Sequence, residues 1–142
     1  MANSVEILPP ADEDVRQLYG LAKRTFGEMP GWSDARVLEV LRRDLVFVAR
    51  EARRPSGYVA LRDDPAAATV VVEQLFVAPG HEHRGIGRRL LAYAEGYAIA
   101  QHAQTLRIVA EESNWRARSF YRRSGFVPVA EDLLELVLPR AG

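Results

Sequence analysis

The sequence of 142 residues contains no cysteine. This absence excludes disulfide bonds, thiolate metal sites, iron–sulfur clusters and a cysteine nucleophile. It is compatible with a reducing compartment, and we expect a cytoplasmic protein. Lysine is almost absent as well, since Lys23 is the only one and the other 18 basic residues are arginines. A P-loop needs a Gly-Lys-Ser/Thr sequence, so the surroundings of Lys23 exclude that nucleotide-binding motif.

An excess of charge of one sign and long apolar runs are also lacking. The 19 acidic residues balance the 19 basic ones, which disfavours a general nucleic-acid binder. The apolar runs are far shorter than the ~18–20 residues that span a membrane. The first residues are acidic and have no apolar segment, so they do not fit a signal peptide. We therefore expect neither nucleic acid nor membrane as a partner.

The length and composition are those of one ordinary globular domain. A chain of 142 residues falls within the usual size of a single domain, about 100–200 residues. The sequence shows no internal repeat, no low-complexity tract and no linker, so we expect residues 1–142 to form a single domain.

Hydrophobic periodicity predicts an α+β fold. The order β-α-α-β-β-β-α-β-α-β-β implies a mixed central sheet of about six to seven strands with four helices. The strands are expected at 5–8, 45–50, 58–62, 69–77, 106–110, 126–129 and 133–138. The helices are expected at 12–26, from 33, at 85–103 and after 114. Residues 53–57 read as a turn, and strands 69–77 and 106–110 should be parallel because a helix connects them.

A glycine-rich segment lies between strand 69–77 and the helix that follows it. Residues 83–89 read His-Arg-Gly-Ile-Gly-Arg-Arg. Two glycines allow a tight turn that gathers backbone N–H groups at a helix start, which suits a phosphate or pyrophosphate. Arginines at a helix N-terminus oppose its dipole, so an anionic ligand would explain them, although a plain glycine turn is the alternative. Leu90 stands where a dinucleotide fingerprint needs a third glycine, which disfavours that motif.

A second motif follows strand 106–110. Residues 114–126 (NWRARSFYRRSGF) contain the pattern Asn-x-x-Ala-x-x-Phe-Tyr-x-x-x-Gly-Phe. Together with the strand, glycine loop and helix before it, this pattern resembles the GCN5-related N-acetyltransferases (GNAT family). The resemblance covers about residues 70–126.

The resemblance implies a single GNAT-like domain that takes acetyl-CoA as co-substrate and transfers its acetyl group directly to a primary amine, without a metal. The family's pyrophosphate loop, Gln/Arg-x-x-Gly-x-Gly/Ala, corresponds to residues 82–87, and Glu82 departs from the pattern. The pantetheine arm is implied to pair with strand residues 75–77. The cofactor-binding residues implied in this way are Leu75, Phe76, Val77, Glu82, His83, Arg84, Gly85, Ile86, Gly87, Arg88, Asn114 and Tyr121.

Two catalytic residues are implied by the same resemblance. Tyr121 matches the family tyrosine that protonates the departing CoA thiolate; the alternative is a core aromatic residue. An amine of pKa about 10.4 is neutral in only ~1 of 10³ molecules at pH 7, so a base is needed. Glu73 resembles the glutamate base of some members, against the alternative of an exposed strand carboxylate. Glu111 and Glu112 are further candidates, and a backbone amide near 76–77 would bind the oxyanion.

Several questions stay open at this stage. His81 and His83 lack a third ligand, so no metal is expected. The acceptor could be a small amine, an amino acid, an antibiotic, or a protein N-terminus or lysine. Homodimer formation also stays open. The main alternative is a non-catalytic acyl-CoA-binding sensor or structural module of the same fold, for which Glu82 is the support, and a longer acyl group is a further alternative.

Overall fold

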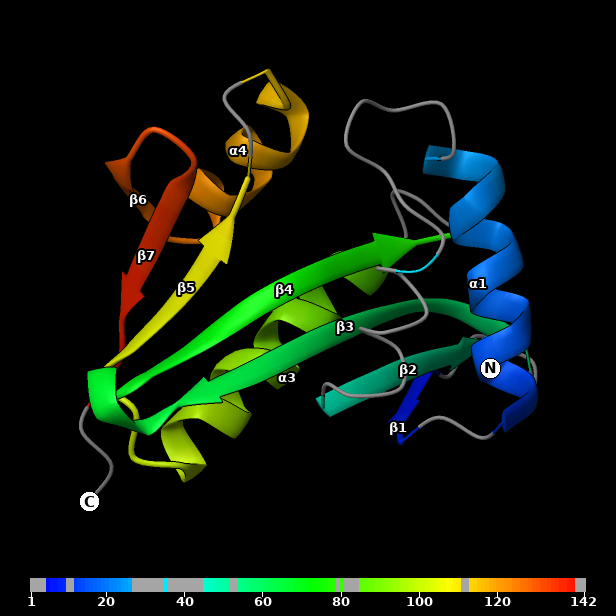
Figure 1. Cartoon of the computed structure of the whole chain (residues 1–142), viewed down its shortest axis with the longest axis horizontal. Helices are drawn as coiled ribbons and strands as arrows, with labels where there is room; N and C mark the ends of the chain where they lie inside the picture. The colour runs from blue at the N-terminus through cyan, green and yellow to red at the C-terminus, as the bar shows by residue number, and fades with distance from the viewer. Residues whose placement is uncertain are drawn as a thin grey trace. The chain divides into compact units, whose positions relative to one another are not determined.

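The structure, a computed structural model, describes residues 5–9, 12–26, 35, 45–51, 54–78, 80, 85–110 and 113–139. Its elements are β1 (Val5–Leu8), α1 (Asp12–Phe26), β2 (Leu45–Glu51), β3 (Arg54–Asp64), the 3-10 helix η1 (Pro65–Ala67), β4 (Thr69–Val77), α3 (Ile86–Ala100), β5 (Thr105–Val109), α4 (Trp115–Arg123), β6 (Val127–Ala130) and β7 (Leu133–Val137) (Figure 1). These described residues hold seven strands and three α-helices. The fourth helix, expected from Ser33, lies outside them.

The strands form one mixed sheet in the order β1-β2-β3-β4-β5-β7-β6. β4 and β5 are parallel, with Thr69 opposite Thr105, which confirms the expected strand–helix–strand crossover. The pairs β1–β2, β5–β7 and β6–β7 are antiparallel. No helix within the described ranges is long and apolar enough to cross a membrane.

The chain divides into two compact units, and β3, β4 and α3 contribute residues to both. The first unit comprises residues 1–60 and 74–91. Its core forms where Leu18 of α1 packs against alternate residues of three strands, because residues i and i+2 of a strand share one face. These core residues are Val46 and Val48 of β2, Tyr58 and Ala60 of β3, Phe76 of β4, and Ala78.

The second unit comprises residues 61–73 and 92–142. In β5, Leu106 and Ile108 are buried while Val109 is 55% exposed, so one face of this strand is covered and the other is not. On the less covered face the guanidinium of Arg107 donates to Glu135 of β7 at 2.7 Å. The two faces of β5 therefore differ in burial, with apolar side chains covered on one face and a polar pair on the other.

The turn expected at residues 53–57 is wrong over 54–57, because β3 already begins at Arg54. Gly57 lies inside the strand, and a Cβ there would stand 2.4 Å from the carbonyl oxygen of Phe76. The amide of Ala78 donates to the carbonyl of Ser56 at 2.7 Å. Gly57 is thus a point of close backbone approach between β3 and β4. In the sequence alone, such a glycine cannot be distinguished from a turn glycine.

Candidate active site

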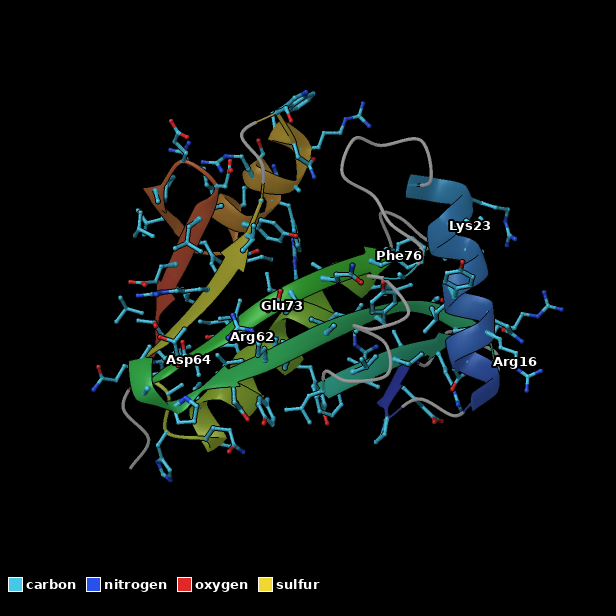
Figure 2. All side chains as sticks on the ribbon, in the orientation of Figure 1. Arg16, Lys23, Arg62, Asp64, Glu73 and Phe76 are labelled. Carbon is cyan, nitrogen blue, oxygen red and sulfur yellow. The ribbon has the colours of Figure 1, made fainter. Side chains whose placement is uncertain are left out.

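The end of β4 holds the three residues expected to bind pantetheine, and they belong to the first unit. Phe76 is buried, whereas Leu75 and Val77 are half-buried. The close approach of Gly57 fixes the backbone of this segment against β3. Figure 2 labels Phe76 near the end of β4.

The glycine loop enters α3 through an unusual backbone conformation. Gly85 has a φ of +77°, in the left-handed region that glycine adopts without strain. A Cβ at Gly85 would meet no atom within 4 Å, so the space beside it is open. The carbonyl of Gly85 accepts from the amide of Arg89 at 3.0 Å, which starts the helix. Such a start can receive an anionic group because the first N–H groups of a helix have no intrahelical partner.

The first turn of α3 is anchored on one side and charged on the other. Ile86 is 1% exposed and holds the turn in the core, while Arg88 and Arg89 are exposed. The turn contains no acidic residue, and in the described part of the chain Arg88 has no acidic partner. Gly87 is half-buried within the same turn. Glu82, His83 and Arg84 lie outside the described residues, so the side-chain contact expected at Glu82 stays a prediction.

Tyr121 lies in the second unit, on α4. Its ring packs between Phe120, with centroids 5.4 Å apart, and Phe126, with centroids 6.1 Å apart. The residue is 7% exposed, and this burial raises its pKa to about 12. The hydroxyl therefore keeps its proton at neutral pH. Within the described ranges the hydroxyl has no hydrogen-bond partner, so its proton is available for a ligand.

Asn114 begins α4 as expected. Its Oδ1 accepts from the amide of Ala117 at 3.4 Å, which makes it the N-cap of the helix. The helix ends before Gly125, whose φ of +100° continues the chain out of the helix. Asn114 is exposed, so its amide nitrogen can contact a ligand while its oxygen caps the helix.

Glu73 is half-buried and is held by an ion pair that the sequence did not reveal. The Nε of Arg62, on the neighbouring strand β3, donates to Oε1 of Glu73 at 2.5 Å (Figure 2). The pair keeps Glu73 oriented and partly neutralises its charge. The other candidate bases, Glu111 and Glu112, lie outside the described residues, as do His81 and His83.

Sequence reasoning missed a polar pair beside the candidate site in the first unit. The hydroxyl of Tyr58 donates to Oε1 of Gln74 at 2.6 Å. Gln74 stands directly before Leu75, yet it belongs to no motif. Only the cross-strand register between β3 and β4 brings the two residues together, and a single sequence does not contain that register.

Comparisons with known proteins agree with the motifs. The sequence profile of the acetyltransferase (GNAT) family matches residues 13–126. A mycothiol acetyltransferase of Cellulomonas flavigena is 34% identical over 134 residues, which cover 87% of this chain and 37% of that protein. A mycothiol acetyltransferase of Beutenbergia cavernae is 41% identical over 66 residues, which cover 46% and 22% of the two chains. The chain thus spans well under half the length of these relatives.

A solved structure shares the fold. The PaiA N-acetyltransferase of Thermoplasma acidophilum, in complex with coenzyme A, superposes with a TM-score of 0.76 at 22% identity and covers 94% of this chain and 99% of its own. The match of the family profile includes β4, the glycine loop and the helix that carries Tyr121. From this match, the chain belongs to the GNAT family of acetyltransferases.

Proposed function

We propose that the protein is an acetyl-CoA-dependent N-acetyltransferase that transfers the acetyl group directly to a primary amine. The observation that carries this proposal is the buried, protonated hydroxyl of Tyr121, which lies in the second family motif and has its proton available. When bound, acetyl-CoA supplies an acetyl group activated as a thioester.

The residues present fit this co-substrate. The open space beside Gly85 and the exposed guanidinium of Arg88 suit a pyrophosphate at the start of α3. Residues 82–88 would hold that group, the backbone of residues 75–77 would pair with pantetheine, and Asn114 would contact the same arm. Each of these assignments follows the family resemblance at matching positions.

In the proposed reaction each residue of the site either transfers a proton or stabilises a charge. A bond forms between the amine nitrogen and the carbonyl carbon, and the carbon–sulfur bond breaks. Glu73 accepts the proton that the amine must lose, and Tyr121 donates a proton to the departing thiolate. A backbone amide near Phe76 or Val77 stabilises the oxyanion of the tetrahedral intermediate. The sequence contains no cysteine nucleophile, which favours direct transfer over a cysteine-linked acyl-enzyme.

The acceptor is a primary amine of unidentified structure. Two relatives are named mycothiol acetyltransferases, but the chain spans 37% and 22% of them. Their acceptor is therefore one candidate beside amino acids, antibiotics and protein amines. The protein is proposed to act in the cytoplasm, as a monomer or a homodimer.

Calorimetric titration with acetyl-CoA, with CoA and NAD as controls, tests the proposal first. We expect micromolar binding of acetyl-CoA and none of NAD. Thiol release with a panel of amines then tests turnover. Absence of acetyl-CoA binding would refute the proposal, and binding without turnover of any amine would favour the sensor.

A further inference from the structure

The pair formed by Tyr58 and Gln74 is a polar contact at the edge of an apolar cluster. Tyr58 is 1% exposed, and its ring lies 5.6 Å from that of Phe76, centroid to centroid. Both rings belong to the core formed with Leu18 of α1. Gln74 precedes Phe76 by two residues and bonds to Tyr58, so its side chain lies on the same face of the sheet.

The hydrogen bond fixes the orientation of the Gln74 amide. Burial raises the pKa of Tyr58 well above its ordinary value, so its hydroxyl stays a donor at physiological pH. Oε1 of Gln74 accepts that proton at 2.6 Å, and the amide nitrogen must then point away from Tyr58. Gln74 is half-buried, and its two N–H groups have no acceptor within the described ranges.

The position of the Gln74 amide nitrogen indicates which group can accept its hydrogen bond. Backbone groups of a strand lie in the plane of the sheet, where pantetheine would pair with residues 75–77, whereas a side chain projects out of that plane. The amide of Gln74 therefore faces a group above the strand, next to the segment that holds the thioester. An attacking amine must keep its lone pair for the carbonyl carbon, so the amide has to donate to another atom of the acceptor.

We infer that Gln74 donates a hydrogen bond to an oxygen of the acceptor, which selects primary amines that carry a carbonyl or hydroxyl oxygen close to the nitrogen. Tyr58 is the positioning residue for this contact. The inference rests on the proposed function and narrows its substrate class. A fixed amide recognises such an oxygen because an alkyl analogue would leave its N–H groups unpaired.

Two matched pairs of amines test the inference with acetyl-CoA as donor. Glycinamide is compared with isobutylamine, and ethanolamine with propylamine, and every kcat/KM is calculated on the concentration of neutral amine because the oxygen-bearing member of each pair has the lower amine pKa. In the wild-type protein we expect kcat/KM about tenfold higher for the oxygen-bearing member of each pair. In Gln74→Leu this ratio should fall to within about twofold of one, with little change for the alkyl amines.

A second set of variants separates recognition from folding. Gln74→Leu leaves the hydroxyl of Tyr58 buried without its acceptor, so the double variant Tyr58→Phe/Gln74→Leu removes both groups and should show the same loss of discrimination. Tyr58→Phe alone should lower the ratio part of the way, to about threefold, because the amide can then rotate. Tyr97→Phe is the matched control: it removes a hydroxyl that donates to Asp63 in the second unit, and it should leave the ratio unchanged.

The outcomes separate this inference from the proposed function. A protein that fails to bind acetyl-CoA contradicts the function itself. A protein that acetylates other amines of the panel but shows equal kcat/KM for both members of each pair, or turns over none of the four amines, overturns the inference alone. A ratio that survives in Gln74→Leu and in the double variant overturns it as well, while an equal loss for all four amines would assign Gln74 to the thioester oxygen instead.

Discussion

The two units each bury one tyrosine, and the two tyrosines differ in whether the hydroxyl group has a hydrogen-bond partner. Tyr58 is 1% exposed and Tyr121 is 7% exposed, and burial raises the pKa of both. The hydroxyl of Tyr58 donates a hydrogen bond to Gln74, whereas that of Tyr121 has no partner in the described part of the chain. The same burial thus yields a fixed contact in one unit and an available proton in the other.

This difference has an energetic meaning. The Tyr121 hydroxyl is not among the fully buried unpaired polar atoms of the described residues, and it has no hydrogen bond to lose, so it contributes little to stability at neutral pH. Its proposed role is proton donation to a thiolate. For Tyr58 the hydrogen bond offsets the desolvation of the hydroxyl and orients a neighbour. The comparison predicts that removal of the Tyr121 hydroxyl mainly lowers activity, whereas removal of the Tyr58 hydroxyl lowers stability.

The largest expected effect is on catalysis. Tyr121→Phe should lower kcat about 100-fold or more, because general acid catalysis of this kind contributes about 10²–10⁴-fold. Steady-state thiol release measures it, and the affinity for acetyl-CoA in calorimetry should change little. Tyr97→Phe, which also removes a tyrosine hydroxyl from the second unit, should keep kcat within about twofold. A Tyr121→Phe protein with kcat within about twofold of the wild type would remove the acid role.

The next effect concerns stability at high pH. The pKa of Tyr121 is raised to about 12 in the folded protein and is near 10 in the unfolded chain, so the folded state binds the proton more tightly. Its contribution is complete below pH 10 and is lost as the pH rises toward 12. Between pH 9 and pH 11.5 the wild type should lose about 2 kcal/mol more than Tyr121→Phe in urea unfolding. Equal losses in the two proteins would contradict the burial of this hydroxyl.

A third effect separates binding from chemistry. Gly85→Glu places a side chain at a φ of +77° and a carboxylate in the space proposed for pyrophosphate, so acetyl-CoA affinity should fall about tenfold or more. Gly96→Glu is the matched control, since it adds the same charge to α3 at an exposed position without a neighbour within 4 Å. Calorimetry distinguishes them, and unchanged affinity in Gly85→Glu would show that the loop does not bind the phosphates.

Much of the fold could be predicted because local patterns decide it. The bounds of β4 were predicted in full, since seven of its nine residues are β-branched or apolar and turn signals lie on both sides. The cap at Asn114 is equally local, because one side chain bonds to an amide three residues later. The start of β3 was missed because glycine, proline and serine are turn residues until a neighbouring strand requires close approach, as Gly57 shows.

The candidate site could be predicted only where a motif carries it. Tyr121 and Gly85 stand at fixed spacings along the chain, so the sequence predicts them. The partners Arg62 for Glu73 and Tyr58 for Gln74 come from the register of β3 against β4, which depends on the whole sheet. The sequence thus predicts the groups that are proposed to react, and the structure adds the side chains that bond to their neighbours or to them.

The smallest expected effect returns to the two tyrosines and concerns stability at neutral pH. Tyr58→Phe should lower the free energy of unfolding by about 1 kcal/mol, because it removes the hydrogen bond to Gln74 from a part-buried position. Tyr121→Phe should change it by less than about 0.5 kcal/mol, because its hydroxyl has no partner to lose. Urea unfolding at pH 7 measures both values on proteins that differ by one oxygen atom each. If Tyr121→Phe proves as destabilising as Tyr58→Phe, the Tyr121 hydroxyl is bonded in solution, and its proton is then not held ready for a thiolate.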